Sequence, residues 1–184
     1  VVRLVGSEMC IRDRFCSVPA KSVISMHDVD TVYSIPILLN KQKVDDTILK
    51  KLNLKIKKPN LNDWKRVVKA KLLPEKEVNV SFVGKYTELK DSYKSINEAL
   101  EHAGIQNKAK VNINFVEAEQ ISSKNVRRVL KKSDAILVPG GFGERGIEGM
   151  ILACKYAREN NVSYLGICLG MQIAIIAVSY THLT

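Results

Sequence analysis

Short apolar runs alternate with helix-period stripes through the second half of the chain. The runs that predict strands cover residues 78–83, 111–115, 135–138 and 162–167. The stripes that predict helices fall within residues 93–103, 126–130, 147–154 and 171–177, and Gly104 is expected to end the first of them. Strand and helix in strict alternation predict a parallel sheet covered on both faces, the doubly wound α/β class.

The strand at 162–167 runs into a glycine-flanked cysteine. Sites in parallel sheets lie at the carboxyl ends of the strands, and Gly166-Ile167-Cys168-Leu169-Gly170 has the G-x-nucleophile-x-G form of a nucleophile elbow. The turn would strain the backbone at Cys168, with glycines on either side making room for it. The following helix N-terminus would favour the thiolate. We therefore predict that Cys168 is a nucleophile and not a core cysteine.

A second glycine-rich loop, residues 140–146, follows the strand at 135–138. Glycines 141, 143 and 146 have the G-x-G-x-x-G spacing of dinucleotide-binding loops, but that fingerprint belongs in the first βαβ unit, with an acidic residue after the next strand. An acyl intermediate needs N–H donors aimed at its oxyanion. We expect the backbone N–H groups of Gly141 and Leu169 to be those donors.

Composition and charge place the first half of the chain in a different role. The chain has 184 residues, of which 46% are hydrophobic and 26% charged, and its net charge is +10. Eleven Lys and Arg against three Asp between residues 41 and 71 account for +8 of that charge. Helix-breaking residues stand along this stretch, namely Asn53, Pro59, Asn60 and Asn62. We interpret residues 41–73 as a basic interdomain linker; because Trp64 is the one aromatic in 41–71, we expect no nucleic-acid partner.

The remaining composition argues against several classes of protein. The cysteines at 10, 16, 154 and 168 form no C-x-x-C pair, and the histidines at 27, 102 and 182 are far from them, so neither a disulfide framework nor a metal site is predicted. No apolar run is long enough to cross a bilayer, and the first thirty residues lack the pattern of a signal peptide. We expect a cytoplasmic protein without membrane association.

The two glycine motifs and the segments around them resemble one family. LVPGGFGERGIEGM and YLGICLGMQ resemble the class I glutamine amidotransferases, and in particular the CTP synthase family. FCSVPAKSVISMHDVDTVYSIPILL resembles the end of that family's synthetase domain, NLNDWKRVV its linker and VSFVGKYTELKDSYKSINEAL the opening of its glutaminase domain. The implied domains are the tail of an α/β synthetase domain at 15–40, the linker at 41–73, and the N-terminal part of the glutaminase domain at 74–177, with a truncated sheet.

The resemblance implies an ATP-dependent ligase of pyrimidine biosynthesis. Glutamine would be hydrolysed through a thioester at Cys168, and its ammonia would aminate ATP-phosphorylated UTP to give CTP. ATP and Mg²⁺ would be cofactors, GTP an allosteric activator, and the enzyme a homo-oligomer, expected to be a tetramer. The Mg²⁺ ligands, the UTP site and the family's catalytic histidine and glutamate are expected outside residues 1–184, so this chain is expected to be inactive by itself.

Site residues are carried over by position. The glutamine and oxyanion positions are Gly141, Leu169, Gly170, Met171 and Gln172; the ATP-adenine positions are His27, Asp28 and Val29; the GTP-responsive loop holds Phe142 and Arg145.

Both ends of the chain depart from the resemblance. Residues 1–14 and 178–184 resemble translated sequencing-adapter sequence, and we expect them to be non-native, with the last helix ending near residue 177 before turn-forming Ser179–Thr181. The last strand and helix would expose an apolar face, which predicts poor soluble expression. Two alternatives stay open: another class I amidotransferase or related cysteine hydrolase, and a non-catalytic nucleotide-binding α/β module.

Overall fold

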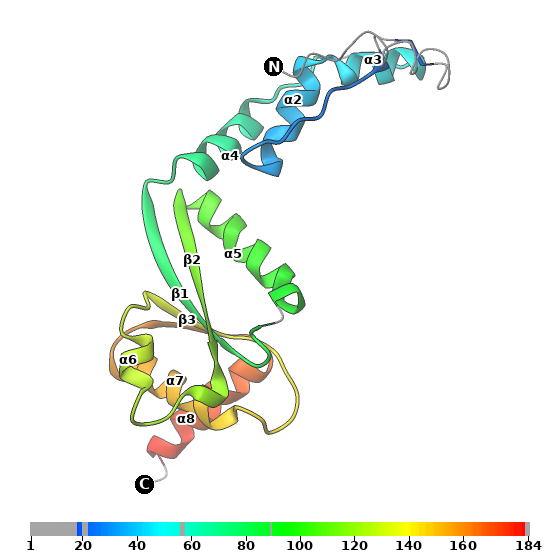
Figure 1. Cartoon of the computed structure of the whole chain (residues 1–184). Coiled ribbons are helices and arrows are strands. Elements are labelled where there is room, and N and C mark those ends of the chain that lie inside the picture. The colour runs from blue at the N-terminus through cyan, green and yellow to red at the C-terminus, as the bar shows by residue number, and fades with distance from the viewer. Residues whose placement is uncertain (1–17, 20–21, 56–57, 89, 183–184) are drawn as a thin grey trace. The chain divides into compact units, whose positions relative to one another are not determined.

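The computed structural model describes residues 18–19, 22–55, 58–88 and 90–182 (Figure 1). The segment 1–14, predicted to be non-native, lies outside the described residues, as do Cys10 and Cys16. The chain divides into two compact units, Val1–Leu72 and Leu73–Thr184, and each is described by itself.

The first unit contains three α-helices and a 3₁₀ turn in its described residues, and residues 23–31 before that turn are not helical. A 3₁₀ turn, η2 (Val32–Ser34), leads into α2 (Ile35–Lys41), and α3 (Val44–Lys51) and α4 (Asn62–Leu72) follow. The indole Nε1 of Trp64 in α4 donates to the carbonyl of Tyr33 at 2.6 Å, and the two rings lie 6.4 Å apart. Helix α4 therefore packs against η2 within this unit.

The basic stretch is more helical than its sequence predicts. Asn53 ends the helical run after α3 with a left-handed backbone, φ 53°, as a helix-breaking asparagine should. Asn60 lies in the non-helical stretch before α4, as predicted, whereas Asn62 is the first residue of α4 and was wrongly predicted to break a helix. The side-chain oxygen of Asn60 accepts the backbone N–H of Asn62 at 3.0 Å, so the pair begins α4 by satisfying a free helix N–H group.

A four-stranded parallel sheet forms the second unit. Its strands are β1 (Lys76–Gly84), β2 (Ala109–Glu117), β3 (Ala135–Val138) and β4 (Ser163–Gly166), in the order β2-β1-β3-β4. All three pairings are parallel. The α/β prediction is confirmed. The chain moves from β1 to β2 on one side and returns to β3 on the other, so the carboxyl ends of β1 and β3 meet where the strand order reverses, which is where ligands bind in such sheets.

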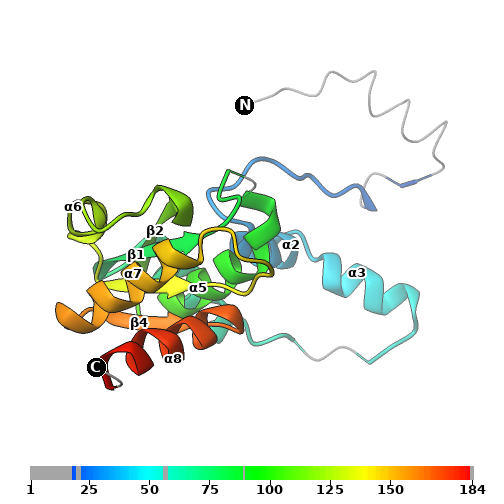
Figure 2. The same ribbon diagram turned by 90° about the horizontal axis from the view of Figure 1, so that it is seen from below.

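Alternate residues of β1, β2 and β3 enter two separate apolar cores, whereas β4 contributes to only one of them. On one face Phe82 and Leu137 are buried, and Tyr93, Ile96 and Leu100 pack against them from η3 and α5. The other face is covered by four elements after β2, which include α7 and α8 lying side by side (Figure 2). The bounds are η3 Lys90–Tyr93, α5 Lys94–Gln106, η4 Ala118–Gln120, α6 Val126–Leu130, α7 Ile147–Glu159 and α8 Leu169–His182. The period of two in the sequence thus divides the side chains between the two helical layers.

Two predicted helix ends are wrong. Helix α5 passes through Gly104 and ends at Gln106; a Cβ on Gly104 would lie 2.6 Å from the Ala109 carbonyl oxygen, so this glycine permits close packing against the start of β2. Helix α8 continues to His182 instead of ending near residue 177. The Ser179 hydroxyl donates to the Ile175 carbonyl at 2.8 Å, one turn back, which lets a turn-forming residue remain helical.

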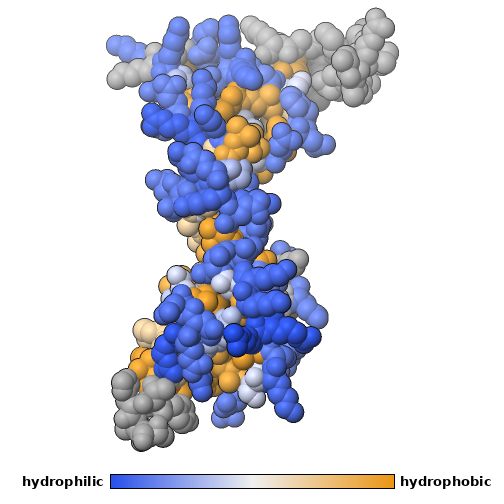
Figure 3. Space-filling view, turned by 90° about the vertical axis from the view of Figure 1, so that its left-hand side faces the viewer, coloured by the Kyte–Doolittle hydropathy of each residue, from blue (hydrophilic) through white to orange (hydrophobic). Residues whose placement is uncertain are grey.

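Apolar side chains remain exposed beside the β4 edge of the sheet. Leu165 of β4 is 55% exposed and Ile175 of α8 is 59% exposed, whereas Ile173 of the same helix is fully buried. Apolar residues reach the surface of this unit in Figure 3. The exposed apolar face expected from the sequence is present, and poor soluble expression stays a prediction. Among the described residues, every helix is too short or too polar to cross a bilayer.

Candidate active site

Cys168 occupies the turn between β4 and α8. Its backbone has φ 53°, in the left-handed region, and the residue is exposed. This conformation costs an L-residue about 1–2 kcal/mol, so the surrounding contacts must hold it in place. Met171 and Gln172 donate their N–H groups to the Cys168 carbonyl at 3.1 and 3.2 Å, which ties the strained residue into the first turn of α8.

The two elbow glycines are required by packing. A Cβ on Gly166 would lie 2.4 Å from the backbone carbonyl atoms of Gly170, and one on Gly170 would lie 2.2 Å from the carbonyl oxygen of Val138. The strand, the turn and the helix therefore approach more closely than any side chain allows. The G-x-Cys-x-G spacing predicted this steric need for glycine at both positions.

The glycine-rich loop after β3 borders the elbow. A Cβ on Gly140 would lie 3.5 Å from the Cys168 Cβ, and one on Gly141 would lie 3.4 Å from Cδ2 of Leu169. The structure thus brings together the two loops that the sequence predicted to cooperate. Leu169 buries its side chain in the core at 8% exposure, while Met171 and Gln172 of the same turn are exposed.

Lys85 was missed by the sequence prediction. It follows Gly84, the last residue of β1, and its side chain is 6% exposed. The ammonium Nζ donates to the carbonyls of Phe142 and Gly143 at 2.9 and 2.7 Å. A lysine at the carboxyl end of an apolar strand was the available signal, since a charge at that edge needs a polar partner.

A second polar cluster joins the loop to η4, the turn that follows β2. The guanidinium of Arg145 makes two hydrogen bonds to the Glu119 carboxylate, of which Nη2 to Oε2 measures 2.9 Å, and it lies 4.7 Å from the centroid of the Tyr86 ring. The hydrogen bond to Glu119 raises the pKa of Arg145 further above its ordinary value. The same bond lowers the pKa of the Glu119 carboxyl.

Tyr164 of β4 stabilises the elbow through a hydrogen bond to its last glycine. Its hydroxyl donates to the Gly170 carbonyl at 2.8 Å. Burial raises the pKa of the Tyr164 phenol, and Cys154 adds to that shift; burial also raises the pKa of the Cys154 thiol. Cys154 is a buried core residue, in contrast to the exposed Cys168.

The other predicted site residues lie in less constrained surroundings. Phe142 projects from its loop with 95% of its side chain exposed. His27, Asp28 and Val29 lie in the first unit, in an extended segment before η2, with His27 and Asp28 exposed. The Gln42 side chain anchors this segment, because it both accepts from and donates to the Ser25 backbone at 2.9 Å.

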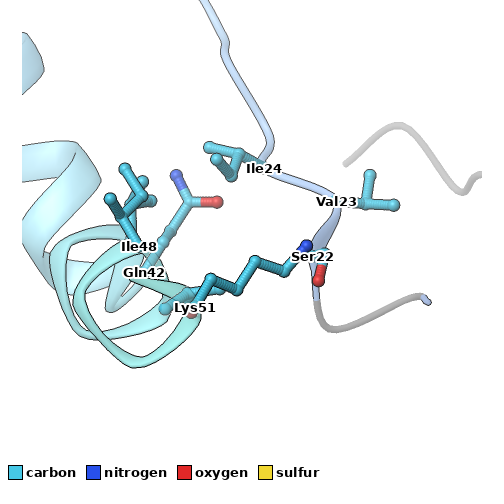
Figure 4. A pocket seen from close by; sticks show the side chains of 8 residues that line it. Ser22, Val23, Ile24, Gln42, Ile48 and Lys51 are labelled. Carbon is cyan, nitrogen blue, oxygen red and sulfur yellow. The ribbon is translucent and has the colours of Figure 1, made fainter. Parts of the chain in front are cut away.

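A cavity of about 410 Å³ lies in the first unit between this segment and α3 (Figure 4). Ser22, Val23 and Ile24 line one side of it. The other side is lined by Gln42, Val44, Thr47, Ile48 and Lys51. None of the predicted ATP positions is among its lining residues, so the cavity and those positions are separate features. No three His, Cys, Asp or Glu side chains of the described part of the chain are grouped so as to hold a metal ion.

Comparison with known proteins agrees with this geometry. Residues 88–181 match the family "Glutamine amidotransferase class-I", and residues 10–54 match "CTP synthase N-terminus". The matched ranges reach into both end segments that the sequence prediction set aside. A similar solved structure is the glutaminase domain of Trypanosoma brucei CTPS with bound acivicin, at 40% identity and a TM-score of 0.52. The match covers 55% of this chain and 40% of that one.

The two matched regions follow one another along the chain, and Cys168 lies in the second of them. The CTP synthase N-terminus region comes first, and the amidotransferase region, with Cys168 strained at an elbow, follows it. More than half of the chain lies in the second region, and the chain therefore belongs to the class I glutamine amidotransferase family, among its CTP synthase members.

Proposed function

We propose that this chain carries the glutaminase nucleophile of an enzyme that makes CTP from UTP, ATP and glutamine. The observation that supports it is Cys168, exposed in a left-handed turn that borders the loop of Gly140 and Gly141. Strained, exposed residues held by rigid surroundings are typical of catalytic positions. The matched CTP synthase N-terminus region ahead of the site supports the choice of product.

The proposed chemistry proceeds in two steps at Cys168. Its sulfur bonds to the side-chain carbonyl carbon of glutamine, and the electron pair of the C=O bond moves to the oxygen. When the C=O bond reforms, the C–N bond breaks and ammonia leaves with the proton that the thiol lost. Water then attacks the thioester and releases glutamate and the free thiol. The N–H groups of Gly141 and Leu169 are the proposed donors to the oxyanion.

Gly170, Met171 and Gln172 are proposed to contact the glutamine that sits over Cys168. The exposed Met171 and Gln172 side chains lie in the first turn of α8, directly after the nucleophile. Phe142 and Arg145 are proposed to respond to GTP. The exposed Phe142 ring offers a face for a base to stack on, and Arg145 would have to share its guanidinium with Glu119.

The synthetase half of the reaction is proposed from the matched N-terminal region alone. His27, Asp28 and Val29 are the proposed contacts to the ATP adenine. Mg²⁺ would accompany ATP, but the described residues offer no group of carboxylates to bind it, so no step is assigned to the metal. The proposal extends to a cytoplasmic homo-tetramer, as the family resemblance implies.

Affinity labelling tests the glutaminase step directly. Diazo-oxonorleucine, a glutamine-like electrophile, should modify Cys168 in the purified protein, and L-glutamine should protect it while D-glutamine should not. Peptide mass mapping reads the site. Cys168→Ser should abolish the label. Cys154→Ala should keep it, because Cys154 is a buried core residue.

Two outcomes would contradict parts of the proposal. Equal labelling of Cys154 and Cys168, without protection by glutamine, would reject a glutaminase site and favour the non-catalytic module. Selective labelling together with glutamine hydrolysis that forms no CTP from UTP and ATP, when the chain is assayed together with a complete synthetase domain, would place the protein with another class I amidotransferase.

A further inference from the structure

Lys85 is a buried cation with a specific task in the loop beside Cys168. A lysine at 6% exposure loses most of its hydration, and such a charge is stable only when polar groups replace the lost water. The replacements here are two consecutive carbonyls, those of Phe142 and Gly143, at 2.9 and 2.7 Å. The ammonium therefore fixes two successive peptide planes, those after Phe142 and Gly143, one residue beyond Gly141.

Side-chain packing does little to hold this part of the loop. Phe142 is 95% exposed, and a Cβ built on Gly143 would meet no atom within 4 Å. Gly143 also has φ 76°, a conformation that glycine adopts in many loops without cost. A loop with so little side-chain packing beside Cys168 needs an anchor, and the Lys85 ammonium supplies one.

The anchor itself is rigid. The Tyr93 hydroxyl donates to the Lys85 carbonyl at 2.6 Å. The Glu117 carboxylate at the end of β2 accepts the backbone N–H groups of Tyr86 and Thr87 at 3.3 and 3.0 Å, and the Thr87 hydroxyl at 3.0 Å. The backbone on both sides of the Lys85 side chain is therefore tied to the sheet and to the helical layer.

We propose that Lys85 is a positioning residue of the glutaminase site, whose ammonium holds the 140–146 loop where the Gly141 N–H can face the oxyanion formed at Cys168. This inference rests on the proposed function. Lys85 reaches loop carbonyls and not Cys168 in this structure, so it acts through the loop. A misplacement of about 1 Å in a reacting geometry costs up to about a hundredfold in rate.

The test compares two reactions of the same thiol. Iodoacetamide needs only an accessible, reactive Cys168. Diazo-oxonorleucine also places its ketone oxygen where the oxyanion would form; its diazo carbon takes a proton from solvent, the sulfur bonds to that carbon, and dinitrogen leaves. Lys85→Met should slow labelling by diazo-oxonorleucine at least tenfold and change the iodoacetamide rate less than twofold. Lys85→Arg, which keeps a cation with several donors, should recover most of the lost rate.

A matched lysine controls for charge. Lys155 is exposed on α7 and lies 3.8 Å from Glu159, away from the loop carbonyls, so Lys155→Met should leave both rates unchanged. If Lys85→Met folds poorly, Lys85→Gln carries the same expectation, and circular dichroism at the assay temperature checks each variant. Loss of folding in both would assign Lys85 to the fold and reject a positioning role.

The two proposals fail in different ways. Unselective labelling of the wild-type protein, without protection by glutamine, would reject the glutaminase site and the role of Lys85 with it. Selective wild-type labelling with an equal diazo-oxonorleucine rate in Lys85→Met would reject only the role of Lys85.

Discussion

The substitution Gly170→Ala distinguishes the effect of helix propensity from that of packing, because the two predict opposite changes in the free energy of unfolding. Gly170 is the second residue of α8. In an ordinary helix, alanine is favoured over glycine by about 1 kcal/mol, so propensity alone predicts that the substitution stabilises the protein. The packing of this turn predicts the reverse.

The magnitude follows from the distance to the end of β3. A Cβ on Gly170 would lie 2.2 Å from the Val138 carbonyl oxygen, 0.8 Å inside the 3.0 Å that real Cβ contacts respect (3.0 minus 2.2). Val138 cannot move away easily, because its carbonyl also accepts the Ile167 N–H at 3.0 Å and its side chain is fully buried. Overpacking of this kind costs about 1–3 kcal/mol, which outweighs the propensity gain. We expect Gly170→Ala to destabilise the second unit.

Urea unfolding followed by far-ultraviolet circular dichroism measures this difference. The packing cost of about 2 kcal/mol less the propensity gain of about 1 kcal/mol leaves a net loss of about 1 kcal/mol, which lowers the midpoint by about 0.5 M at a slope of about 2 kcal/mol per molar urea. Gly143→Ala is the matched control: no atom lies within 4 Å of its Cβ position, so only its left-handed backbone, φ 76°, penalises alanine, by about 1 kcal/mol. A Gly170→Ala protein as stable as the wild type, or more stable, would refute the packing argument.

Two further substitutions test the strain at the elbow and the anchor of Lys85. In urea unfolding, Cys168→Gly should be more stable than Cys168→Ala by about 1 kcal/mol. Both variants lack the thiol, and only alanine is strained at φ 53°. Equal stabilities would show that the backbone of the turn relaxes. Tyr93→Phe removes the hydrogen bond to the Lys85 carbonyl and should cost about 1 kcal/mol near pH 8. Burial raises the Tyr93 pKa above its ordinary 10.0, so the neutral phenol stabilises the folded state below about pH 10 and this contribution is lost as the pH rises toward the folded pKa. The stability difference between the wild type and Tyr93→Phe should therefore shrink above pH 10. Unfolding curves at pH 8 and pH 11 measure it. A difference that grows with pH would contradict the stabilising role of the neutral Tyr93 phenol.

Local patterns predicted most of the second unit. The alternating run at Val111, Ile113 and Phe115 forms β2. As the alternation required, these three residues pack on the same face of the sheet, in the core that α5 covers. Predictions failed where a residue's partner lies elsewhere in the fold. Gly104 resembles a helix terminator until β2 passes 2.6 Å from its missing Cβ. Ser179 resembles a turn residue until its hydroxyl is satisfied by the carbonyl of Ile175.

In the candidate site too, the local features were predicted and the long-range contacts were not. The spacing of Gly166, Cys168 and Gly170 predicted the elbow, because a strand-turn-helix junction is set by neighbours in the chain. No pattern indicated that Lys85 holds the loop after β3, since its two acceptors lie 57 and 58 residues further along the sequence.

By itself, the sequence determined the order of strands and helices, the parallel α/β class and the place of the Cys168 turn, because side-chain periodicity and turn sterics act over a few residues. The tertiary structure alone decided which strand ends meet, which glycines stand against a neighbouring backbone and which cation anchors the loop beside Cys168. Those contacts join segments that come together only when the sheet forms, so their energies depend on distances that no local pattern contains.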